Sequence, residues 1–144
     1  MQPTIDFYLL AQPDKKDKFL YACRIIEKAY LRNHVIFIYC ENQADAETLD
    51  EMLWTFKEDS FIPHNLQGEG PEPPPPVQIG FGDEPRNFQD ILINLSNEVP
   101  GFYSRFKRII EVVSEDHDDK ELSRTRYRHY RTSQCNIKTH HINA

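Results

Sequence analysis

The stretch VIFIYC, residues 35–40, is an unbroken run of apolar and aromatic side chains. Such runs are typical of strands that are covered on both faces, and they imply parallel pairing with helices above and below the sheet. On either side of this run, apolar residues recur at helical spacing over 17–32 and 43–56. The run and its neighbours predict an α/β domain of three layers.

The rest of the chain extends this pattern. Thr4–Leu10 alternates apolar and polar residues and predicts a first strand, so the chain opens with a Rossmann-like strand–helix–strand unit. Five of the ten prolines fall in 68–76, which predicts an extended spacer. The sequence thus indicates one domain over 1–133 with a mostly parallel sheet, and it predicts further strands at 77–81, 90–95 and 106–113, a helical turn at 100–103, a last helix at 120–132 and a polar tail at 134–144.

Charge is unevenly distributed along the 144 residues. Asp and Glu number 23 against 17 Lys and Arg, a net charge of −6, yet 120–131 holds five basic residues and one acid. The other residues therefore sum to −10, which favours one acidic peptide partner over a DNA duplex. The three cysteines show no disulfide or zinc spacing, and we find neither a signal peptide nor a membrane span. We therefore expect a cytoplasmic protein.

An amphipathic helix and the loop after it present two large aromatic side chains. At 100° per residue, Leu49, Leu53 and Phe56 share one face of the helix, whereas Trp54 points about 140° away from Leu49. Phe61 follows five residues after Phe56. Aromatic residues in such positions are typical anchors of protein–protein contacts, although both rings covering a sheet edge is an equally open interpretation.

The last predicted helix carries basic residues on one face. Four cations surround one tyrosine within an arc of about 100°, with Val113 just before the helix. Guanidinium groups bind carboxylates in a bidentate manner, and an aromatic ring with an apolar wall receives an apolar side chain. The pattern predicts a pocket for a short acidic peptide with an apolar end, although a solvated charged face or a single-strand binding site would look similar. The residues concerned are Lys120, Arg124, Tyr127, Arg128 and Arg131.

Motifs for catalysis and cofactors are missing from the sequence. The turn after the first strand, 10–15, has no glycine to approach a pyrophosphate, and no G-x-S-x-G elbow occurs. His64 has no neighbouring nucleophile or paired carboxylate, so we expect a loop histidine that bonds backbone. We therefore predict no catalytic residue and no cofactor. We also predict no metal, because the one candidate metal set fits no tetrahedral spacing: His129, Cys135, His140 and His141.

Five segments together resemble the chi-subunit family of bacterial DNA polymerase III. The block at 60–71 is the most specific of them, and the set spans nearly the whole chain. The segments are 7–10 (FYLL), 49–54 (LDEMLW), 60–71 (SFIPHNLQGEGP), 90–93 (DILI) and 126–131 (RYRHYR).

The resemblance implies a Rossmann-like fold without nucleotide chemistry and a non-catalytic accessory subunit of the clamp-loader complex in DNA replication. It implies a heterodimer with the psi subunit through Trp54, Phe61, Pro63 and His64. A repair helicase is the alternative partner for the same surface. The resemblance also implies a pocket for the acidic, Phe-terminated tail of single-stranded-DNA-binding protein at Val113, Lys120, Arg124, Tyr127, Arg128 and Arg131. Direct DNA contact is not expected.

Two features depart from the family pattern. Arg128 stands where the family often has Lys, which keeps the charge but changes the geometry, and the spacer at 68–76 is unusually rich in proline. Two other functions remain open from the sequence: a direct single-stranded-DNA binder, and a nucleotide-dependent enzyme on an atypical Rossmann-like domain.

Overall fold

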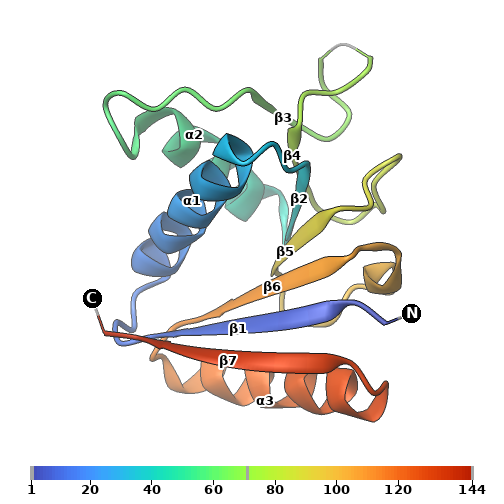
Figure 1. The fold of residues 1–144 in the computed structure, drawn as a ribbon. Helices are drawn as coiled ribbons and strands as arrows, with labels where there is room; N and C mark the ends of the chain where they lie inside the picture. Colours follow the sequence, from blue (N-terminus) through green and yellow to red (C-terminus); the bar gives the residue numbers. More distant parts are fainter. Residues whose placement is uncertain (1, 71, 144) are drawn as a thin grey trace.

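The computed structural model describes residues 2–70 and 72–143. Within them, seven strands form one sheet in the order β3-β4-β2-β5-β6-β1-β7, and all neighbours pair in parallel (Figure 1). The strands are β1 (Thr4–Leu10), β2 (Ile36–Cys40), β3 (His64–Leu66), β4 (Val77–Gly80), β5 (Ile91–Leu95), β6 (Arg108–Val113) and β7 (Asn136–Ile142). The helices are α1 (Lys15–Leu31), α2 (Gln43–Thr55), α3 (His117–Thr132) and the short 3₁₀ turn η1 (Tyr103–Arg105).

The predicted three-layer α/β fold with a parallel sheet is confirmed. β2, the centre of the apolar run, lies between β4 and β5, and Ile36, Phe37 and Ile38 are completely buried. Helices α1 and α2 cover one face of the sheet and α3 covers the other (Figure 1). No helix in the described part of the chain has the length and apolar character needed to cross a membrane.

The two faces of the sheet are covered in different ways. On one face, α1 and α2 bury a continuous apolar stripe that includes Ile26 and Leu49. Burying each such side chain contributes about 1.5–3 kcal/mol. On the other face α3 lies beside β1, β6 and β7, and the loops before and after β5 supply Phe88, Phe102 and Phe106 in place of a further helix. As a result, α3 is the long helix of this face, and it lies over the β7 edge of the sheet.

The starts of α2 and α3 are fixed by side-chain caps. Asn42 accepts a hydrogen bond from the backbone N–H of Asp45 at 2.8 Å, and Asp116 accepts one from that of Asp119 at 3.0 Å. Asp14 occupies the N-cap position of α1 without a side-chain hydrogen bond. Lys18 instead ties α1 to α3, because its Nζ lies 3.1 Å from the Asp119 carboxylate.

Two strands were not predicted. The segment 134–144 was expected to be a polar tail, but Asn136–Ile142 forms β7, which pairs with β1 along its full length. One edge and much of the surface of β7 are exposed, and only Ile137 and Ile142 in this strand are aliphatic. The alternation of apolar residues that predicts a strand is therefore weak. β3 was assigned to a loop because it is only three residues long.

Other boundaries moved by a few residues. The helical turn expected at 100–103 is the 3₁₀ turn at 103–105, and α3 begins at His117 instead of Lys120. The described residues of the 68–76 spacer form neither helix nor strand, while residue 71 lies outside the described part.

Candidate functional site

Two aromatic rings project from the end of α2 and the coil that follows it. Trp54 is 49 % exposed and Phe61 is 69 % exposed, and their ring centroids are 5.8 Å apart. The indole therefore faces away from the core, as the helical phase predicted. We call Trp54 and Phe61, with Pro63 and His64 beside them, the aromatic surface.

His64 supports this surface from within. Its side chain is fully buried, and its ring lies 4.3 Å from that of Trp54, centroid to centroid. Nδ1 is 2.7 Å from the carbonyl oxygen of Ile62, while Nε2 is 3.2 Å from the carbonyl oxygen of Asp50 and 3.1 Å from its carboxylate. The histidine therefore bonds backbone, as expected, and it joins β3 to α2 beneath the indole, where it touches no solvent.

A groove of about 610 Å³ opens between α3 and the carboxyl ends of β1 and β7. Its floor is apolar and its rim is polar. We call it the basic groove, and it is lined by Phe7, Leu9, Leu10, Ala11, Val113, Glu115, Lys120, Ser123, Arg124, Tyr127, Thr139, His141, Ile142 and Asn143. Four of the six residues predicted for the tail pocket thus meet in one cavity: Val113, Lys120, Arg124 and Tyr127.

Both cations of the basic groove have acidic neighbours. Lys120 Nζ lies 2.8 Å from Glu115 Oε1, and Arg124 pairs with Glu121 one turn before it on α3. All four of these side chains are at least 40 % exposed. Exposed ion pairs contribute about 0–1 kcal/mol, so an incoming carboxylate can replace the partner acids at small cost.

Arg128 and Arg131 do not line the basic groove. Both are exposed on α3, and Arg128 Nη2 lies 3.3 Å from Thr125 Oγ1. Helical phase places them on the same face as Lys120, but Arg131 lies eleven residues further on, or about 16 Å along the axis. The predicted set therefore divides into four groove residues and two cations beyond its end.

The sequence interpretation missed a buried polar network that holds α3. Glu111, in the centre of β6, is fully buried and accepts hydrogen bonds from Arg126 Nε at 2.8 Å, Tyr130 Oη at 2.7 Å and Asn94 Nδ2 at 2.9 Å. Burial is the main cause that raises the pKa of Tyr130, and the nearby Glu111 carboxylate raises it further. The phenol therefore stays protonated and donates a hydrogen bond to Glu111. The available signal was the spacing of Ser123, Arg126 and Tyr130, which is that of a buried helical stripe.

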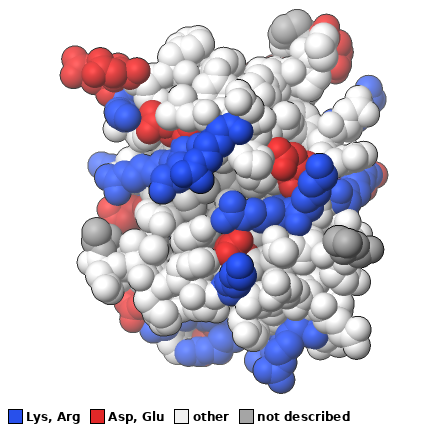
Figure 2. All heavy atoms as spheres, viewed as in Figure 1, with Lys and Arg blue, Asp and Glu red and all other residues white. Residues whose placement is uncertain are grey.

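A further charged cluster lies on the opposite face of β1. Arg108 Nε and His140 Nε2 each lie 2.8 Å from a carboxylate oxygen of Asp6, and the His140 ring stacks on Tyr8 with centroids 4.7 Å apart. Burial alone would raise the pKa of Asp6, but the hydrogen bonds from His140 and Arg108 hold it below its usual value. Figure 2, viewed as Figure 1, shows Lys and Arg side chains across the middle of the surface, with Asp and Glu side chains among them. The cluster joins β6, β1 and β7.

A second cavity lies at the carboxyl ends of β2, β5 and β6, where Rossmann-like domains bind nucleotides, and most of its charged residues are acidic. This cavity of about 540 Å³ is lined by Asp14, Asp45, Asp116 and Asp118, among others, and by the two lysines Lys15 and Lys18. Although burial opposes ionisation of Asp119, also in this cavity, Lys18 and hydrogen bonds from Ser114 hold its pKa below the usual value. Phosphate groups would be repelled here, which counts against the nucleotide-dependent enzyme.

The four residues weighed as metal ligands lie apart. His140 faces Asp6 on one side of β7, His141 lines the basic groove on the other, and Cys135 Sγ is near Gln2. His129 packs edge-on against Tyr103 from α3. Within 2–70 and 72–143, no three His, Cys, Asp or Glu side chains are placed to share a metal ion.

Burial raises the pKa of Cys23 and of Cys40 to about 12, which leaves both thiols unreactive.

The fold and these surfaces define the class: a Rossmann-like α/β domain without a glycine-rich phosphate loop, with one aromatic surface and one basic groove. The family model described as DNA polymerase III chi subunit, HolC, matches residues 2–138. The chain belongs to this family, as its resemblance to the chi subunit had indicated.

Curated relatives agree over most of their length. The chain is 36 % identical to DNA polymerase III subunit chi of Pseudomonas aeruginosa, covering 96 % of each chain, and 34 % identical to that of Haemophilus influenzae, covering 99 % of each. It is 35 % identical to the Escherichia coli subunit, covering 81 % of this chain and 80 % of the relative.

A solved structure supports the fold alone. The crystal structure of T4 UvsW superposes with a TM-score of 0.67 at 8 % identity, covering 97 % of this chain and 41 % of that one. This structural similarity supports the parallel α/β fold, and it assigns no functional residue to this chain.

Proposed function

We propose that this protein is a non-catalytic adaptor of the replication clamp loader in the cytoplasm, which binds the psi subunit with its aromatic surface and the acidic tail of single-stranded-DNA-binding protein in its basic groove. Membership of the chi family places it in DNA polymerase III. The observation that carries the finer proposal is the groove itself, in which Lys120 and Arg124 lie beside an apolar floor.

The groove has the chemistry of a receptor for an acidic chain end. Lys120 and Arg124 lie on its rim, where they can take carboxylates, and Val113 with Tyr127 forms an apolar wall beside them. A peptide whose acids precede a terminal Phe would satisfy both parts at once. Arg128 and Arg131, beyond the groove, would act on such a peptide only at longer range.

The aromatic surface suits a larger and less charged partner. Two exposed rings in contact offer apolar area with few rotatable bonds, and buried His64 fixes the indole from behind. We assign Trp54 and Phe61 to direct contact with psi, Pro63 to the margin and His64 to positioning. A repair helicase that competes with psi would use the same two rings.

The test compares a short peptide of sequence D-D-x-P-F with a naked single-stranded oligonucleotide. We expect the peptide to bind with a Kd in the micromolar range, about −7 to −8 kcal/mol, and to lose binding when its final Phe is deleted. Calorimetry on the wild type and on Arg124→Ala measures both ligands. Binding of the oligonucleotide without binding of the peptide would favour the direct single-stranded-DNA binder instead.

A further inference from the structure

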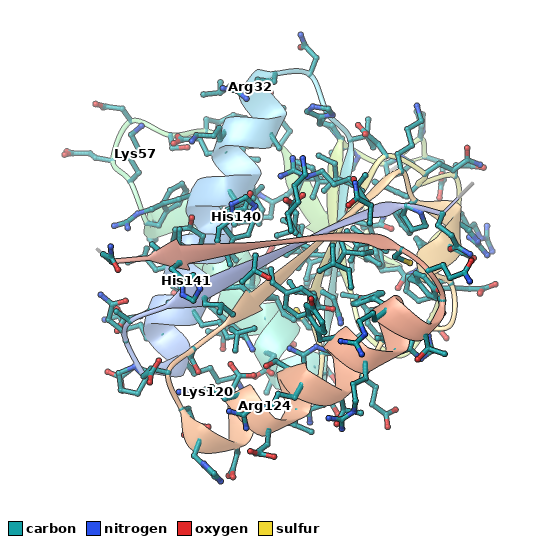
Figure 3. All side chains as sticks on the ribbon, turned by 60° about the horizontal axis from the view of Figure 1, so that its bottom comes forward. Arg32, Lys57, Lys120, Arg124, His140 and His141 are labelled. Atoms are coloured by element: carbon teal, nitrogen blue, oxygen red, sulfur yellow. The ribbon has the colours of Figure 1, made fainter. Side chains whose placement is uncertain are left out.

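β7 brings a second wall to the basic groove. Side chains alternate across a strand, so Thr139 and His141 face α3 while His140 faces the other way. Figure 3 shows His141 on the side of Lys120 and Arg124, with His140 on the opposite side of the strand. Their register partners on β1 are Phe7 for Thr139 and Leu9 for His141, and both of these line the groove floor.

Resting on the proposed function above, we propose that β7 is part of the receptor and that His141 is a further ligand for the acidic chain end. Binding then strengthens when the imidazole takes up a proton. The family model ends at residue 138, just before the part of β7 that lines the groove, so the match assigns nothing to this wall.

The groove holds titratable side chains of several types around His141. α3 contributes Lys120, Arg124 and Tyr127, the segment before it contributes Glu115, and β1 contributes only apolar residues. Lysine, arginine and tyrosine titrate well above pH 8 and glutamate well below pH 6, whereas histidine changes charge in between.

The two adjacent histidines differ in their partners. Asp6 lies 2.8 Å from His140, whereas in the described residues no Asp or Glu side chain forms an ion pair with His141. An arriving carboxylate would therefore meet an imidazole that is not already paired with a side-chain acid. Because β7 pairs with β1 along its full length, the backbone that carries His141 is in place before the ligand arrives.

The experiment measures the Kd of the D-D-x-P-F peptide by calorimetry at pH 6 and pH 8. The wild type is expected to bind about threefold to fivefold more tightly at pH 6, the scale of one exposed ion pair. His141→Gln should remove this difference, while the matched control His140→Gln should keep it. His141→Lys, charged at both values, should bind tightly at both.

Each outcome separates the two proposals. Peptide binding that keeps its pH ratio in His141→Gln, or that is insensitive to pH in the wild type, overturns the role of His141 and leaves the groove assignment standing. An absence of peptide binding by the wild type at both pH values overturns the proposed function and this inference together. Thermal melts of all variants identify any that have lost the fold.

Discussion

The aromatic surface comes from one continuous stretch, 50–64. The basic groove instead needs side chains from β1, the end of β6, the segment before α3, α3 itself and β7, from Phe7 to Asn143. The first is a projection of two neutral rings, and the second is a cavity with charges at its rim. A local site depends on one helix and the coil after it. A composite site depends on every contact that holds its walls together.

The largest expected effect comes from breaking the contact that holds the helical wall of the groove. Glu111→Ala would leave Arg126 as an unpaired buried charge and remove the acceptor of Tyr130 and Asn94. We expect the free energy of unfolding to fall by about 3–5 kcal/mol, measured by urea denaturation. At temperatures where the variant is folded, peptide binding should weaken more than psi binding, because the network holds α3 and not α2.

The matched control is Glu115→Ala, the same substitution at an exposed position. Its unfolding free energy should change by less than about 0.5 kcal/mol. Equal losses in the two variants would mean that the Glu111 network does not anchor α3.

The next effect concerns the aromatic surface alone. Trp54→Ala should weaken psi binding by about 2 kcal/mol or more, which is roughly thirtyfold, because exposed aromatic anchors dominate such interfaces. Peptide binding should not change. Pull-down with psi and calorimetry with the peptide measure the two effects on one sample.

Leu31→Ala is the control for this variant, since Leu31 is an apolar side chain on α1 that is 70 % exposed. It should leave both partners bound. A lower melting temperature in Trp54→Ala with psi binding intact would show that the indole serves the fold instead of a partner.

This contrast also decides how far each site can be predicted from sequence. The exposure of Trp54 follows from helical phase within one segment, and the three layers follow from the apolar run at 35–40. The groove was predicted only on its helical side. Its other wall lies in 136–142, where the polar composition of an edge strand hides the period of two.

Arginines of the last helix illustrate a second limit. Arg124 and Arg126 are two residues apart, yet the first lies on the groove rim and the second is buried against Glu111. A count of charges along 120–131 treats them alike. Their roles separate only when the acceptor on β6 is known, and its distance in sequence hides it from any local pattern.

Salt should weaken peptide binding more than psi binding, by a smaller factor than the substitution of Trp54 weakens psi binding. Raising NaCl from about 50 to about 300 mM should weaken peptide binding by about fivefold, since exposed charges are screened over shorter distances at higher ionic strength. Psi binding, which depends on apolar area, should change by less than twofold. Similar salt dependence for both partners would contradict the division into an apolar and an ionic site.

The smallest expected effect is an increase in affinity for the peptide. Glu115 lies on the groove rim, where it pairs with Lys120 and repels an acidic ligand. Glu115→Gln should free the ammonium group and tighten peptide binding about twofold to threefold, the scale of one exposed ion pair. Glu58→Gln, an exposed acid in the loop beside the aromatic surface, should leave it unchanged. If the two variants bind the peptide equally, removing negative charge anywhere on the protein is sufficient, and the geometry of the rim does not select the ligand.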